Sequence, residues 1–131
     1  MLYIDEKTQQ INITRGDIAQ FDFTTLNENG ELYTFKAGDV LRFKVFKKNL
    51  CSAVVLQKDF TIEEDSTVAE IILNAEDTKI GNIINKYVDY WYEIELNPDT
   101  APQTLVGYEV SEKGEIKEKI FRLLPEGADI W

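Results

Sequence analysis

Residues 89–97 read DYWYEIELN, and this stretch decides the fold class. Its side chains alternate strictly, with Tyr90, Tyr92, Ile94 and Leu96 on one face and Asp89, Trp91, Glu93 and Glu95 on the other. Successive side chains of a β-strand point to opposite faces of the sheet, so a period of two predicts an antiparallel strand buried on one side. We therefore expect the two glutamates on a solvated face.

The same period recurs in residues 18–25, 40–48 and 67–74. Weaker strand candidates lie at 10–14, 52–62, 104–110 and 117–124. These segments are rich in β-branched and aromatic side chains, which suit a pleated, half-buried surface. Their inward faces predict a core that comprises Phe21, Phe23, Leu41, Phe43, Val45, Ile71, Tyr92, Ile94 and Leu96.

The sequence also predicts one short helix at residues 74–81. Asn74 is placed to cap its N-terminus, acidic residues follow in the first turn, and Gly81 is placed to end it. We expect an all-β fold, an antiparallel immunoglobulin-like β-sandwich of about seven to nine strands, in a single domain spanning residues 1–131. Residues 1–9 would form an N-terminal extension and residues 126–131 a C-terminal tail. A small barrel is the alternative, because periodicity cannot separate the two architectures.

A short pattern occurs twice, since Gly16-Asp17 and Gly38-Asp39 each precede an alternating segment. We expect each pair to form a turn that starts a strand, with glycine supplying an unusual φ and aspartate capping backbone N–H groups. Arg15-Gly16-Asp17 is an RGD tripeptide, and its place before a strand indicates a structural role rather than an adhesion motif.

Composition excludes several classes of function. The chain has no histidine, which excludes histidine-based catalysis and histidine-ligated zinc. Its single cysteine, Cys51, cannot form an intramolecular disulfide and is expected to be an ordinary strand residue. We expect no metal and no cofactor. The net charge of −10 makes binding to nucleic acid or to an anionic membrane surface unfavourable.

The sequence predicts no membrane insertion, because it lacks an apolar run of about 18 residues. The first residues, MLYIDEKTQQ, lack the basic and then apolar pattern of a signal peptide. We therefore expect the protein to start in a cytoplasm.

Two aromatic and four basic residues are candidates for an interaction surface. Trp91 points away from the predicted core, and Trp131 lies at the last position. An exposed tryptophan can anchor a partner subunit or stack on a sugar. Basic side chains are expected to oppose the acidic surface of a neighbour, which predicts a role for Arg42, Lys44, Lys47 and Lys48.

An ordered series of motifs resembles a known family. It comprises Ile13-Thr14-Arg15-Gly16-Asp17, Phe21-Asp22-Phe23, Asn29-Gly30, Tyr33-Thr34-Phe35, Lys36-Ala37-Gly38-Asp39-Val40, Phe43-Lys44-Val45-Phe46-Lys47-Lys48, Glu76-Asp77-Thr78, the strand Tyr90–Leu96 and Thr104-Leu105. Over about residues 11–125 the chain resembles the N-terminal domain of baseplate upper proteins. These are small β-sandwich proteins from tail and baseplate gene clusters of phages and prophages of Gram-positive bacteria.

The resemblance implies a non-enzymatic structural protein, located in a virion or in the host cytoplasm during assembly. Its partners would be other tail or baseplate subunits, or copies of itself. Two alternatives remain open from the residues alone. One is a small carbohydrate-binding module that uses Trp91 and nearby tyrosines, and the other is a small enzyme that uses a pair of carboxylates.

Overall fold

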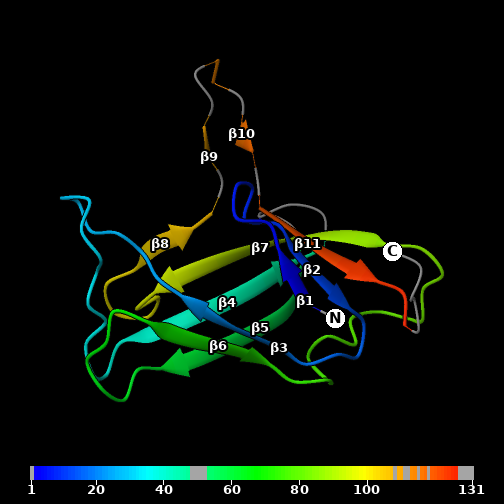
Figure 1. Ribbon diagram of the computed structural model, residues 1–131, viewed down its shortest axis with the longest axis horizontal. Coiled ribbons are helices and arrows are strands. Elements are labelled where there is room, and N and C mark those ends of the chain that lie inside the picture. Colours follow the sequence, from blue (N-terminus) through cyan, green and yellow to red (C-terminus); the bar gives the residue numbers. More distant parts are fainter. Residues whose placement is uncertain are drawn as a thin grey trace.

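The computed structural model describes residues 2–47, 53–107, 109–110, 113–114, 116–117 and 119–126, and the fold is all-β (Figure 1). One large sheet has the strand order β1-β2-β11-β7-β4-β5, and β8 also pairs with β7. The strands of this sheet are β1 (Leu2–Ile4), β2 (Ile11–Thr14), β4 (Val40–Phe46), β5 (Val54–Thr61), β7 (Val88–Leu96), β8 (Gln103–Val106) and β11 (Lys119–Leu124). Among the described residues, no helix is long and apolar enough to cross a membrane.

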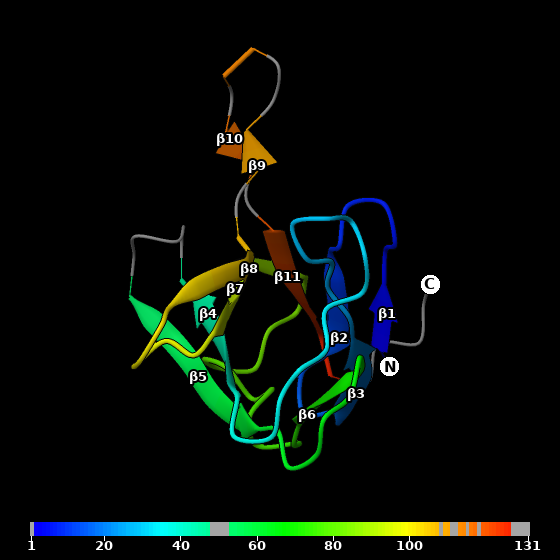
Figure 2. The same cartoon turned by 90° about the vertical axis from the view of Figure 1, so that its left-hand side faces the viewer.

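A second layer consists of two antiparallel strands, β3 (Ala19–Phe23) and β6 (Ala69–Leu73). Figure 2 shows that the large sheet is curved and that this ribbon lies against its concave side. Ala19, Ile71 and Leu73 of the ribbon share one buried cluster with Leu41 and Phe43 of the large sheet. A third ribbon, formed by β9 (Glu109–Val110) and β10 (Ile116–Lys117), stands away from both layers (Figures 1 and 2).

Strand β7 is the alternating segment from which the fold was predicted, and it is the best-connected strand of the large sheet. One of its edges pairs with β4 along most of its length, from Leu96 opposite Leu41 to Trp91 opposite Phe46. The other edge pairs first with β11 and then with β8. The inward residues Tyr92, Ile94 and Leu96 are buried, which confirms the predicted orientation.

The large sheet is mixed rather than fully antiparallel. β11 runs parallel to β2, with Phe121 opposite Ile11 and Leu123 opposite Ile13. The expectation of an all-antiparallel fold is therefore wrong at this pair. Alternation within one strand reports only which faces are buried, and it carries no information about the direction of a neighbour that is distant in sequence.

Most of the predicted core is buried, namely Leu41, Phe43, Val45, Ile71, Tyr92, Ile94 and Leu96. Phe21 and Phe23 are only half-buried, so their prediction as core residues was wrong. The reason is that β3 belongs to a ribbon of only two strands, and both rings line an open groove beside it. The core also contains Phe35 and Phe121, which the alternating segments did not single out.

The helix predicted at residues 74–81 is a hydrogen-bonded turn. The N–H groups of Asp77 and Thr78 donate to the Asn74 carbonyl at 3.0 and 3.3 Å. The Asp77 carboxylate accepts the N–H of Asn74 at 2.8 Å and so bonds back to the first residue of the turn. The turn does not extend because Thr78 is fixed to the Gly16-Asp17 turn: its hydroxyl donates to the Asp17 carbonyl at 2.7 Å and accepts from Gly16 N–H at 3.0 Å.

The repeated Gly-Asp pattern forms the predicted turns. Gly16 has a φ of 89° and Gly38 a φ of 96°, in the region that favours glycine. The carboxylate of Asp39 accepts the backbone N–H of Lys36 at 2.9 Å, which confirms the capping role at the second turn. Arg15 of the RGD tripeptide is buried and donates to the carbonyls of Ile80 and Gly81, so its structural interpretation is also confirmed.

Replacing Phe43 by alanine is expected to lower the free energy of unfolding by about 3–5 kcal/mol. The ring is fully buried and contacts the rings of Tyr92 and Phe121, with centroids 5.5 and 6.1 Å away. Urea unfolding measures this loss. Val68→Ala is the control, because Val68 is exposed and its truncation should cost less than about 0.5 kcal/mol. A similar cost for both substitutions would contradict the assigned core.

Thr78→Val is expected to lower the free energy of unfolding by about 1–3 kcal/mol, although the two side chains have nearly the same shape. The substitution leaves the Gly16 N–H and the Asp17 carbonyl without the hydroxyl that both of them bind. Thr61→Val on the exposed side of β5 is the matched control and should be nearly neutral. Equal stability of wild type and Thr78→Val would show that the hydroxyl does not hold the two turns together.

Candidate functional site

Two of the predicted basic interaction residues are engaged within the chain. On the outer face of the large sheet, Arg42 binds Asp59 through two contacts of 2.8 and 3.0 Å and also lies 3.1 Å from Asp99. The hydrogen bonds from this guanidinium lower the pKa of Asp59. Lys44 Nζ lies 2.7 Å from Glu95 and 3.7 Å from Glu93. A neighbouring subunit would have to displace these carboxylates before it met either cation.

The expectation that Glu93 and Glu95 lie on a solvated face was wrong. Both side chains are largely buried, with 17% and 16% of their surface exposed. Strand β8 pairs with one edge of β7 and places Thr104 opposite Glu95. Strand β4 pairs with the other edge and places Lys44 opposite Glu93. The alternation of β7 placed both glutamates on the correct face, but it could not show that other side chains cover that face.

Trp91 is half-buried in a row of apolar side chains on the outer face. Phe46 of β4 and Ile120 of β11 are its direct cross-strand neighbours. Phe46 is only 5% exposed although it does not belong to the inner core cluster. The half-burial of Trp91 is therefore explained by packing against its neighbours within the sheet. Of the remaining predicted residues, Lys47 is exposed, while Lys48 and Trp131, like Cys51, lie outside the described residues.

A cation stacked on an exposed ring was not found by sequence reasoning. Arg122 makes two contacts with Asp89, of 2.7 and 3.0 Å, and its guanidinium lies 4.0 Å from the centre of the Tyr87 ring. Tyr87 is 54% exposed. The only signal in the sequence was that Asp89 and Arg122 each occupy an outward position of an alternating strand. That the two residues lie opposite each other is shown by the pairing of β7 with β11 in the structure.

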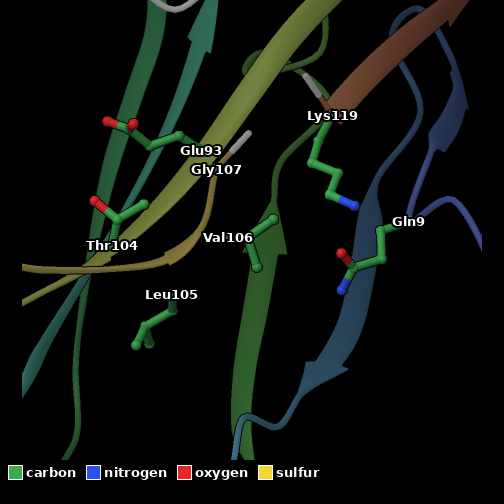
Figure 3. A pocket seen from close by; sticks show the side chains of 7 residues that line it. All are labelled: Gln9, Glu93, Thr104, Leu105, Val106, Gly107 and Lys119. Carbon is green, nitrogen blue, oxygen red and sulfur yellow. The ribbon is translucent and has the colours of Figure 1, made fainter. Parts of the chain in front are cut away.

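A pocket of about 360 Å³ lies where β7 exchanges one neighbour for another, at the base of the β9–β10 ribbon (Figure 3). Lys119 and Gln9 lie on one side of the pocket, Glu93 and Thr104 lie on the other, and Val106 is between them. Gln9 has a φ of 60°, which is uncommon for a residue with a side chain, and its carbonyl accepts the Tyr92 hydroxyl.

The electrostatics of this pocket are set by burial and by the nearby glutamates. Burial raises the pKa of Glu93, and the adjacent Glu95 raises it further, whereas Lys44 opposes both effects. Burial also raises the pKa of the Tyr92 phenol. Lys119 is only 6% exposed. In the part of the chain that the structure describes, no three potential metal-ligating side chains are grouped together.

Glu93→Gln is expected to stabilise the fold at neutral pH. Because the pKa of Glu93 is raised on folding, the folded protein holds this proton more tightly than the unfolded chain does. The resulting stabilisation is present below the ordinary glutamate pKa of about 4.3 and is lost as the pH rises through the raised value. The advantage of the variant in urea unfolding should therefore grow between about pH 4 and about pH 7.

Glu28→Gln is the control for this pH series, because Glu28 is exposed in the loop between β3 and β4. Its stability relative to wild type should change little over the same range. If Glu93→Gln instead lost stability most strongly at neutral pH, the contact between Glu93 and Lys44 would outweigh the cost of burying the carboxylate.

Comparison of the chain with protein-family models, with curated proteins and with solved structures found no match in any of the three.

Proposed function

We propose that this protein is a non-enzymatic assembly subunit of a phage-tail or baseplate particle, and that it acts through protein–protein contacts. In this proposal its two layers form an immunoglobulin-like sandwich that serves as a body for contact elements. The family resemblance of the sequence motifs supplies the particle type. The observation that carries the proposal is the β9–β10 ribbon, which we call the arm.

The arm extends away from the body of the molecule (Figures 1 and 2). It forms a two-stranded sheet of its own, in which Val110 lies opposite Ile116. An isolated hairpin of two strands is marginally stable in water at best. A projecting ribbon is therefore a natural candidate for contact with another molecule, which would supply the packing that the body does not provide.

The base of the arm is firmly held. The chain enters it from β8, where Val106 is buried opposite Ile94, and it returns through Lys119, which is buried opposite Tyr92. The chain leaves β8 at Gly107, where a larger residue would clash, because a Cβ atom at this position would lie 2.8 Å from the methyl group of Thr104. Val106 and Lys119 thus tie both ends of the arm to the sheet, and this tethering reduces the entropy that a partner must overcome.

Charge sets the kind of surface that the arm can meet. Residues 109–118 contain Glu109, Glu112, Glu115 and Glu118 against Lys113 and Lys117. An acidic arm on a chain of net charge −10 favours a basic partner over another copy of the same chain at low salt. The proposal therefore favours assembly with a different subunit.

The carbohydrate-binding alternative depended on an exposed tryptophan. Trp91 is half-buried between Phe46 and Ile120, which leaves less of its ring for a sugar to stack on. An oligosaccharide screen with Trp91→Ala as its control separates this alternative from assembly.

Shortening the arm is expected to abolish assembly while preserving the fold. Residues 109–117 are replaced by Asn-Gly, which favours a tight hairpin turn. Co-sedimentation with the products of the neighbouring tail genes should be lost, whereas the free energy of unfolding should change by less than about 1 kcal/mol, because within the described residues β9 and β10 pair only with each other.

Ile83→Ser is the matched control for the arm. It removes the most exposed of the large apolar side chains in the described chain, at 79%, without touching the arm or its base. This variant should assemble as wild type does. Undiminished assembly of the arm-shortened variant would show that the contact lies elsewhere, and a wild-type protein that joins no neighbouring product would contradict the assembly function itself.

A further inference from the structure

The second layer of the fold is incomplete. Within the described residues, β3 and β6 are the only strands that cover the concave side of the large sheet, which has many more strands (Figure 2). A groove of about 420 Å³ lies between β3 and the beginning of the chain. Its lining includes the apolar side chains of Ile11, Phe21, Phe23, Tyr92 and Ile94. We call this feature the β3 groove, and it explains why the two phenylalanines of β3 are only half-buried.

One wall of the β3 groove is the free edge of a strand. Residues 21–24 line it consecutively, so the backbone as well as the side chains of β3 faces the groove. β3 pairs with β6 from Ala19 opposite Leu73 to Phe23 opposite Ala69, and in the described part of the chain no other strand pairs with it. The N–H and C=O groups on this edge are a template for an additional strand.

The rim of the groove is acidic. Asp5, Glu6 and Asp22 line it, and no lysine or arginine does so within the described residues. Glu6 and Asp22 are exposed, while the Asp5 carboxylate accepts the backbone N–H groups of Lys7 and Thr8. The acidic rim and the net charge of −10 disfavour a second copy of this chain and favour a basic occupant.

We propose that the β3 groove binds an extended, basic segment of a different protein by strand addition to β3. The segment turns alternate apolar side chains into the groove against Phe21 and Phe23. Its intervening lysine or arginine side chains lie on the opposite face, beside Asp22. Pairing along Ala19–Phe23 requires about five residues of the partner, or about 17 Å of extended chain. This inference rests on the proposed assembly function, since the segment would belong to a neighbouring subunit.

The test uses the full-length protein and the end-blocked peptide Lys-Ile-Lys-Val-Lys-Ile-Lys, with binding followed by NMR titration and amide exchange. The peptide is expected to bind and to slow the exchange of amide protons within residues 20–24. A peptide with glutamate in place of every lysine should bind at least about fivefold more weakly, because it meets the acidic rim with like charge. A peptide that is N-methylated at alternate positions should fail to bind, because it cannot pair with the strand edge.

Asp22→Lys tests the rim, and Glu70→Lys is its matched control. The two residues are direct cross-strand neighbours on the exposed face of the same ribbon, but only Asp22 lines the groove. Asp22→Lys is expected to weaken binding of the basic peptide at least about fivefold, and Glu70→Lys less than about twofold, since its charge is one strand further away.

Several results would overturn the proposal. The proposal is wrong if the basic peptide does not bind, or if the N-methylated peptide binds equally well. It is also wrong if Asp22→Lys and Glu70→Lys weaken binding equally, or if the isolated protein forms a dimer that Asp22→Lys dissociates. The last result would assign the groove to a second copy. Assembly with neighbouring gene products is measured separately. If Asp22→Lys assembles normally, the groove proposal is wrong and the assembly function stands. If the wild type binds the peptide but assembles with no neighbouring product, the assembly function is wrong and the groove still binds a basic segment.

Discussion

The division of one edge of β7 between two strands is the constraint on which the rest of the structure depends. β11 pairs with the first part of this edge and β8 with the second. The chain that joins β8 to β11 therefore leaves the sheet beside Ile94 and returns to it beside Tyr92. The arm lies between these two points in the chain, and the pocket bounded by Gln9, Glu93 and Lys119 lies where the neighbours change. Both features are located at a single sheet edge.

The sequence predicted what depends on neighbours in the chain and missed what depends on distant ones. Alternation located β4, β6 and β7 and their buried faces, because a strand that is half-buried must show it in a period of two. The Gly-Asp turns were also local, since the φ of Gly16 and Gly38 is a property of one residue. The parallel pairing of β2 with β11 left no comparable trace. Nor did the small size of the β3–β6 ribbon, which determines the exposure of Phe21 and Phe23.

The candidate site residues show the same limit. Arg42 and Lys44 were expected to point outward, and they do, but the register of β5 and β7 places acidic side chains beside them. A charged residue on an outward face is available to a partner only if the adjacent strands place no opposite charge beside it. The predicted helix failed for a related reason: its capping residues are present, but Thr78 bonds to a turn more than 60 positions earlier and stops the helix after one turn.

The parallel pairing of β2 and β11 has a consequence for synthesis of the protein. β2 ends at Thr14 and β11 begins at Lys119, so the large sheet joins two strands that leave the ribosome far apart in time. Arg15 strengthens this closure, because its backbone N–H donates to the Leu124 carbonyl and its side chain pairs with Glu126. While β11 is still in the exit tunnel, β7 lacks one neighbour, and the Ile11 and Ile13 side chains cannot reach their final packing. The fold is therefore completed only once β11 has left the ribosome, and until then the nascent chain exposes strand edges that chaperones can protect.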